Sequence, residues 1–198
     1  MSPAGSALTV VAAEAYTPRM SVGRSSDEEL ARQSAAGHPE AFDELVKRHQ
    51  DPMYSLAYRV VWDRQDAIDC VQEALFRAWK AIGRFRSDAK VSTWLHQIVL
   101  RVAYDCCAAR KRRPQTAGAG ADETQLPARG CDPDDRLDLI EALRTLDAEF
   151  RAVVVACDVF GMSLLEAAEA LGVPEGTVKS RRSRGLARIA ATLSAQPL

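Results

Sequence analysis

Apolar residues recur at steps of three and four through most of the chain, which is the spacing of one face of an α-helix. Ser26, followed by Glu29 three positions later, has the spacing of a capping box and predicts the start of a first helix. Gly37 is suited to end that helix, and Pro39 to begin the next. We expect four helices in this part of the chain, at about 27–36, 39–60, 65–82 and 91–112.

The periodicity stops between residues 114 and 133, where the sequence reads PQTAGAGADETQLPARGCDP. About twenty residues rich in glycine, proline and alanine are too many for a connection inside one compact domain. This stretch is therefore predicted to be a linker, with a second group of helices following it.

The last two predicted helices have the pattern of a helix-turn-helix. Ser163 and Glu166 form a second capping box in front of the short helix LLEAAEAL. Gly172 then turns the chain, and Pro174 precedes a final helix that ends near Leu193.

The predicted fold class is all-α: two small helical domains joined by a flexible linker, with a helix-turn-helix in the C-terminal one. The expected boundaries are a disordered N-terminal tail at 1–25, a first helical domain at 26–113, the linker at 114–133 and the helix-turn-helix domain at 134–198.

Composition narrows the class of protein. The 198 residues include 26 basic and 27 acidic side chains, and the net charge of −1 excludes a uniformly basic nucleic-acid-binding chain but not a local basic face. The five cysteines form no C-x-x-C pair, which argues against a disulfide framework and a zinc module and favours a reduced, cytosolic chain. No apolar run reaches the ~18 residues of a membrane span, and the N-terminus lacks the basic start of a signal peptide.

The final helix concentrates basic charge on one side. At 100° per residue, Val178, Gly185, Leu186 and Ile189 are expected to face the domain interior. The opposite face carries Thr177, Ser180, Arg184 and Arg188, with Lys179 and Arg181 beside them. Such a face is either a solvated basic surface or a helix that enters the major groove of DNA. The coincidence of capping box, turn and arginine spacing favours DNA binding.

The predicted helix at 65–82 has a different pair of faces. Val71, Leu75 and Trp79 are expected to point inward. Opposite them lies an acidic strip that either is solvated, as composition alone favours, or binds a basic partner. The strip consists of Asp66, Asp69, Gln72 and Glu73.

Nothing in the sequence predicts an enzyme. His38, His49 and His96 lack the mutual spacing of metal ligands or of a catalytic triad. Phosphate-binding loops and nucleophile elbows are also absent from the sequence, so we expect no catalytic residue, metal or cofactor.

Two long stretches, taken together, resemble a bacterial RNA polymerase sigma factor of the extracytoplasmic-function group. The first, at 63–113, contains the helix D-x-x-D-x-x-Q-E and a later F-R-x(n)-W-L segment. The second, at 143–189, ends in E-G-T-V-K-S-R. The resemblance covers most of the chain from about Ser26 to Leu193, and the order of these motifs around a linker makes it specific.

The resemblance implies roles for three sets of residues. Asp66, Asp69, Gln72 and Glu73 correspond to the set that binds the clamp helices of the polymerase β′ subunit. Arg84, Phe85, Arg86, Ser87, Asp88, Trp94 and Arg101 correspond to the surface that opens the −10 promoter element. Thr177, Lys179, Ser180, Arg181 and Arg184, with Arg188 on the same face, correspond to the reader of the −35 element.

The chain departs from the family pattern at two positions. Arg101 stands where many members carry asparagine, which affects the expected −10 base preference. Arg182 stands where an aliphatic residue is commoner, and on this helix it falls on the apolar side.

The implied function is that of an alternative sigma factor that binds core polymerase, including its β subunit, and is held inactive by an anti-sigma factor. The free chain is expected to be a cytoplasmic monomer without membrane insertion. A stand-alone helix-turn-helix regulator and a helical adaptor that ignores DNA are the alternatives.

Overall fold

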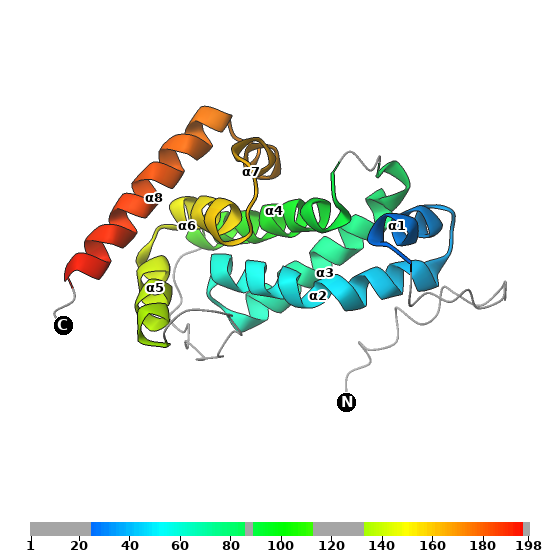
Figure 1. Cartoon of the computed structure of the whole chain (residues 1–198), viewed down its shortest axis with the longest axis horizontal. Helices are drawn as coiled ribbons and strands as arrows, with labels where there is room; N and C mark the ends of the chain where they lie inside the picture. The colour runs from blue at the N-terminus through cyan, green and yellow to red at the C-terminus, as the bar shows by residue number, and fades with distance from the viewer. Residues whose placement is uncertain (1–24, 86–88, 113–132, 196–198) are drawn as a thin grey trace.

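The computed structural model describes residues 25–85, 89–112 and 133–195, and within these ranges all regular structure is helical (Figure 1). The predicted tail and linker therefore lie outside the described residues, and their assignment stays a prediction. The helices are α1 Asp27–Ala35, α2 Pro39–Val61, α3 Arg64–Ala81, α4 Val91–Arg112, α5 Pro133–Thr145, α6 Ala148–Val154, α7 Leu164–Leu171 and α8 Glu175–Ala195, with a 3₁₀ turn η2 at Ile82–Arg84 and a π-helical turn η3 at Val155–Val159.

The helix ends follow the capping residues of the sequence. Ser26 accepts a hydrogen bond from the Glu29 amide, and Ser163 and Glu166 form the full reciprocal capping box. The sequence had not indicated Asp63, whose carboxylate caps α3 by accepting a bond from the Asp66 amide at 2.8 Å.

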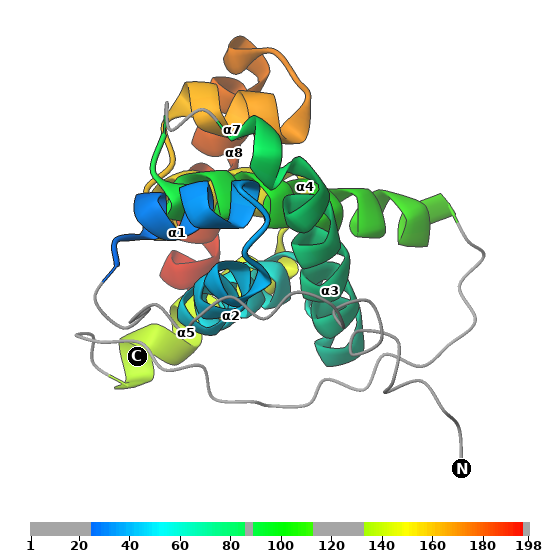
Figure 2. The same cartoon turned by 90° about the vertical axis from the view of Figure 1, so that its right-hand side faces the viewer.

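Helix α4 lies in the middle of the molecule. It packs against α2 and α3 on one side and against α6 and α7 on the other (Figures 1 and 2). The core is almost entirely apolar, and its largest fully buried side chains include Met53, Leu56, Leu95, Leu100 and Leu171. The two groups of helices are thus in direct contact through α4 and the end of α2.

A buried arginine joins the two groups. Arg151 of α6 is 7% exposed, and its Nε donates to the carbonyl oxygen of Val60 at 2.8 Å. Its Nη1 donates to the carbonyl oxygen of Leu146 at 2.7 Å. Beside this link, the His96 ring meets the Phe160 ring edge-on at 5.2 Å.

Gly185 brings α8 close to α6. A Cβ atom at this position would lie 2.7 Å from Cγ2 of Val154 and 3.5 Å from Cβ of Phe150. Val154 is β-branched and buried, so its methyl group cannot easily move aside. The absence of a side chain therefore sets the distance between the two helices.

None of the helices within the described residues is both long and apolar enough to cross a bilayer.

We expect Gly185→Ala to lower the free energy of unfolding by about 1–3 kcal/mol, because overpacking against Val154 outweighs the better helix propensity of alanine. Gly176→Ala is the matched control, since a Cβ there meets nothing within 4 Å; it should leave stability unchanged or raise it. Urea unfolding measures both. Adding Val154→Ala to Gly185→Ala should cost less than the sum of the single effects, and strict additivity would contradict the proposed contact.

Candidate polymerase and nucleic-acid interfaces

The residues of the acidic strip lie on the outer face of α3. Asp69, Gln72 and Glu73 are exposed, and Asp66 is half-buried. The opposite face of the helix packs into the core through small residues such as Ala67, Ala74 and Ala78.

The carboxylates of the strip differ in their partners. Asp66 forms an ion pair with Arg110 of α4 at 3.0 Å, and Glu73 accepts a bond from Nε of Arg77 at 2.7 Å. Asp69 accepts only an amide bond, from a glutamine one turn earlier, and has no ion pair among the described residues. Asp69 is therefore the carboxylate of the strip most available to a basic partner.

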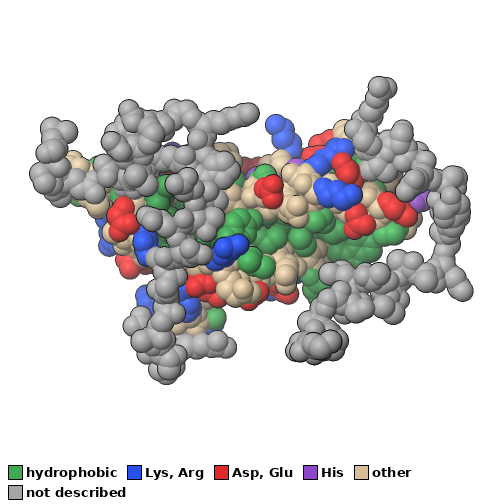
Figure 3. All heavy atoms as spheres, turned by 90° about the horizontal axis from the view of Figure 1, so that it is seen from below, with side chains coloured by type: hydrophobic (Ala, Val, Ile, Leu, Met, Phe, Trp, Pro, Cys, Tyr) green, Lys and Arg blue, Asp and Glu red, His purple; other side chains and the backbone are tan. Residues whose placement is uncertain are grey.

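Two aromatic side chains adjoin the strip. Phe76 is 53% exposed, with the ammonium group of Lys80 4.0 Å above its ring. The prediction that Trp79 points inward was wrong: it is 42% exposed, although its ring still meets that of Phe42 in a T-shaped contact with centroids 5.0 Å apart. The lower face of the molecule, to which α2 and α3 contribute, shows an apolar area among charged side chains (Figure 3). A partner of α3 would meet apolar surface as well as negative charge.

The second candidate surface follows α3. Arg84 is exposed, and the half-buried Phe85 packs against Trp94, with ring centroids 5.1 Å apart. The predicted residues Arg86, Ser87 and Asp88 lie outside the described residues.

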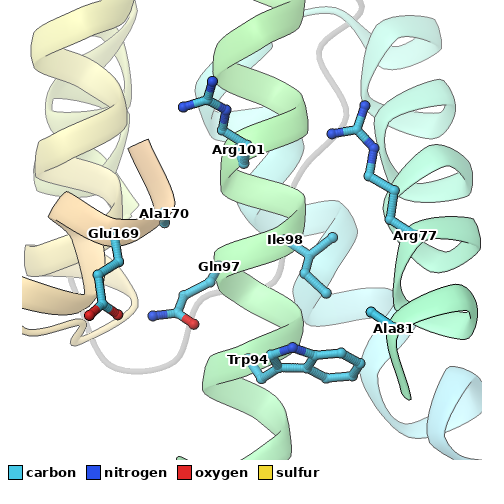
Figure 4. Close-up of a pocket in the computed structure, with 8 residues that line it drawn as sticks. All are labelled: Arg77, Ala81, Trp94, Gln97, Ile98, Arg101, Glu169 and Ala170. Atoms are coloured by element: carbon cyan, nitrogen blue, oxygen red, sulfur yellow. The ribbon is translucent and has the colours of Figure 1, made fainter. Parts of the chain in front are cut away.

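A cleft of about 370 Å³ opens between α3, α4 and α7 (Figure 4). Trp94 and Arg101 border it from α4, and an adjoining hollow of about 400 Å³ reaches Arg84 and Phe85. The described residues of the predicted −10 set are thus brought together around one recess. The cleft is lined by Arg77, Ala81, Trp94, Gln97, Ile98, Arg101, Glu169 and Ala170.

Two polar lining residues of α3 and α4 were missed in the sequence. Gln97 lies between Trp94 and Arg101 on the same face of α4, a three- and four-residue spacing that could have indicated it. Arg77 reaches the cleft from α3, and only the packing of α3 on α4 reveals its position.

Helix α7 closes one side of the cleft. Nη1 of Arg101 donates to the carbonyl oxygen of Leu171 at 2.7 Å, and Gln97 donates to the carbonyl oxygen of Glu166 at 3.4 Å. Glu166 and Glu169 of α7 also line the adjoining hollow. In this arrangement α7 covers part of the surface predicted to take DNA.

The third candidate surface is α8. Val178 and Ile189 are buried, and Gly185 lies against α6 as expected. The inward placement of Leu186 was wrong, since this side chain is 39% exposed. Of the predicted DNA-reading residues, Lys179, Ser180, Arg184 and Arg188 are exposed, whereas Thr177 and Arg181 are half-buried.

Arg182 is not buried on the apolar side of α8. Its guanidinium forms a two-pronged ion pair with Asp158, with Nε 3.0 Å from Oδ2 and Nη2 2.6 Å from Oδ1. No local pattern predicts this pair, because the two residues are 24 positions apart.

The thiols within the described residues are poorly suited to chemistry. Burial raises the pKa of Cys70, Cys106 and Cys107 above the ordinary thiol value, which keeps them protonated near neutral pH. The part of the chain that the structure describes contains no cluster of histidine, cysteine or acidic residues able to hold a metal ion.

Family models match both halves of the chain. The model described as Sigma-70 region 2 matches residues 45–113, and the model described as Sigma-70, region 4 matches residues 136–189.

Curated relatives match along most of their length. The ECF RNA polymerase sigma factor SigM of Mycobacterium tuberculosis is 38% identical over 183 residues, which cover 90% of this chain and 91% of that protein. The ECF RNA polymerase sigma factor SigW of Bacillus subtilis is 32% identical, covering 78% of this chain and 89% of its own.

Solved structures of two other proteins have a similar fold. CnrH in complex with the cytosolic domain of CnrY aligns with a TM-score of 0.61 and 31% identity, covering 86% of this chain and 99% of CnrH. The sigma factor RpoE in complex with the anti-sigma factor NepR, from Bartonella quintana, aligns with a TM-score of 0.63 and 25% identity, covering 79% and 98%.

The half-buried ring of His96, whose Nε2 is buried without a hydrogen-bond partner among the described residues, predicts acid sensitivity of its contact with Phe160, just after η3. Burial, together with nearby His49, lowers the pKa of His96 to about 4. Because this value is below the ordinary ~6.5, the neutral ring stabilises the fold above about pH 6.5, and that contribution is lost as the pH falls toward 4. Between about pH 7 and about pH 4.5, the native chain should lose more free energy of unfolding than His96→Leu, as measured by urea unfolding. Equal losses would contradict this assignment.

Proposed function

We propose that this chain, which belongs to the extracytoplasmic-function group of sigma-70 RNA polymerase sigma factors, joins core polymerase to promoter DNA through three separate surfaces. It is an alternative sigma factor that directs transcription initiation. We expect it to catalyse no reaction itself and to act in the cytoplasm, where the polymerase works. The observation that carries the proposal is the segregation of an exposed acidic face on α3 from an exposed basic face on α8.

The acidic strip of α3 is proposed to bind the clamp helices of the β′ subunit. Asp69 supplies a carboxylate that forms no ion pair with any described residue, while Gln72 and Glu73 extend the polar surface. Phe76 and Trp79 add exposed apolar area next to the charge, which a protein partner can bury. Asp66 is expected to contribute mainly by holding Arg110 in place.

The recess around Trp94 is proposed to hold the opened −10 strand. Phe85 and Trp94 offer aromatic faces for an unstacked base, and Arg84 and Arg101 offer positive charge for its phosphates. The loop residues Arg86, Ser87 and Asp88 complete the proposed set. Contacts to the displaced strand offset the cost of unpairing, which is a few kcal/mol.

The exposed face of α8 is proposed to read the −35 element in the major groove. The helix presents Lys179, Ser180 and Arg184 to the solvent near its N-terminal half, which is the end that helices of this motif insert. Thr177 adjoins this face.

We propose that an anti-sigma factor holds the free chain inactive, as the solved complex of RpoE with the anti-sigma factor NepR suggests for a related protein. The bonds between α4 and α7 support a closed inactive form, because they occupy Arg101 and Gln97. Elements at −10 and −35 lie about 25 base pairs, or about 85 Å, apart. While α4 and α7 touch each other, the domains that carry them cannot reach both promoter elements at once. The two domains must therefore separate on the polymerase.

Asp69→Arg should weaken capture of the chain by purified core polymerase by about tenfold or more, because it places a positive charge opposite a basic surface. The matched control is Asp51→Arg, an equal charge reversal at an exposed position of α2 outside the strip. A pull-down with core polymerase and promoter-specific transcription in vitro are the two measurements. The control should behave as the native chain.

Failure of core polymerase to capture the native chain in the absence of any inhibitor would overturn the proposed function. Specific protection of an operator by the chain alone, as a dimer on twofold half-sites, would instead support the stand-alone regulator.

A further inference from the structure

Three of the five basic side chains on α8 point back onto their own domain. Arg181, Arg182 and Arg188 each form an ion pair with a carboxylate that lies between residues 147 and 158. Lys179 and Arg184, the other two, have no ion pair within the described ranges of the chain. The basic residues of one helix therefore fall into two structural groups.

The three paired arginines bond different carboxylates, but all of their side chains extend toward the same part of the domain. Nη2 of Arg181 lies 2.8 Å from the Glu149 carboxylate, and Nη1 of Arg188 lies 2.8 Å from Asp147. Arg188 also covers the face of the Phe150 ring at 4.3 Å. All three guanidinium groups thus reach toward α6 and η3, away from the exposed face at Lys179, Ser180 and Arg184.

The ion pairs lie on both sides of the glycine contact. Gly185 sets the separation of α8 and α6, because no side chain fits between its Cα and Val154. A glycine contact fixes distance but does not resist rotation of α8 about its own axis. Arg182 precedes Gly185 and Arg188 follows it, so their carboxylate bonds restrain that rotation from two ends.

We expect the three ion pairs to contribute little to the free energy of unfolding but to restrict the rotation of α8 about its axis. Exposed ion pairs add little free energy to folding, and the side chains of Arg182 and Asp158 are 41% and 25% exposed. A two-pronged bond between guanidinium and carboxylate is nevertheless restricted in angle. Rotating α8 by about 30° would move its Cα atoms by about 1.2 Å, given their ~2.3 Å distance from the helix axis. A shift of that size breaks hydrogen bonds to base edges.

We propose that Arg181, Arg182 and Arg188 are positioning residues for −35 recognition, and that Lys179, Ser180 and Arg184 make the DNA contacts. This inference rests on the proposed function and revises the sequence-based assignment of Arg181 and Arg188. Any paired arginine that reached a phosphate would bring its carboxylate partner toward the DNA, which like charge disfavours.

The Arg182–Asp158 pair provides the main test. Holoenzyme made from core polymerase and the full-length chain first selects promoters from a random DNA library, and the −35 segment of a selected promoter is then randomised. Arg182→Asp and Asp158→Arg should each reduce the base preference by about fivefold or more at two or more −35 positions. The chain carrying both changes should regain the native preference within about twofold. Arg184→Ala should also lose preference, but Asp158→Arg should not restore it.

Salt dependence separates positioning from phosphate contact. The measured quantity is the affinity of the holoenzyme for promoter DNA, plotted as its logarithm against the logarithm of salt concentration. Lys179→Gln should reduce the slope of this plot by about 1, whereas Arg182→Gln should leave the slope unchanged. A slope reduced by about 1 in Arg182→Gln would show a direct DNA contact and overturn the inference.

A purely structural role has a different signature. It would lower the active fraction of Arg182→Asp while leaving the −35 preference of the active molecules native, and this result would also overturn the inference. Should Arg182→Asp fail to fold, Arg182→Gln combined with Asp158→Asn removes the ion pair without adding a charge. An unchanged −35 preference in that double variant would likewise overturn the inference. Absence of any promoter-specific transcript from the native holoenzyme would instead reject the proposed function itself.

Discussion

The contact between the two groups of helices depends on the buried guanidinium of Arg151. Burial disfavours its charge and lowers its pKa, and no carboxylate lies within ion-pair distance among the described residues. Its compensation comes from carbonyl oxygens, above all that of Val60 at the C-terminal end of α2, where the helix dipole is negative. The same group binds Leu146, so one side chain connects α2, α6 and the end of α5. Without it, the Leu146 carbonyl would lose a charged donor, and the Val60 carbonyl would keep, among the described residues, only the weak bond from the Cys107 thiol at 3.6 Å.

Helix α4 serves two purposes that compete. Its face at Trp94, Gln97 and Arg101 is the surface proposed above to hold the melted promoter strand, and α7 rests on the same surface. The closed arrangement is therefore stabilised by the very side chains that the open one would expose. This competition gives an inhibitor a simple way to act, because it only has to favour a contact that the chain already makes.

Much of the fold followed from the sequence, because helix ends are set by local signals. Ser163, Gly172 and Pro174 predicted the helix-turn-helix with its bounds within about two residues, and the structure agrees. Periodicity failed for Trp79 and Leu186, since it gives the direction of a side chain but not whether a neighbouring helix covers it. The acidic and basic faces were predictable for the same local reason. The cleft and the pairing of Arg182 required contacts between residues distant in sequence, so no local pattern could predict them.

Gly172 carries two requirements at one position. It ends α7 in the left-handed conformation, with φ of +64°, and a Cβ there would lie 2.6 Å from Nη1 of Arg101. The turn of the DNA-binding motif and the contact with Arg101 of the other domain therefore both depend on the absence of a side chain at position 172. A side chain at 172 would have to displace the flexible end of Arg101 and, with it, the bond from Nη1 to the carbonyl oxygen of Leu171. A relative with a short side chain at 101 is released from this second requirement and keeps only the first. The long cation at 101 makes this turn a point of contact between the two groups of helices as well as a bend within one of them.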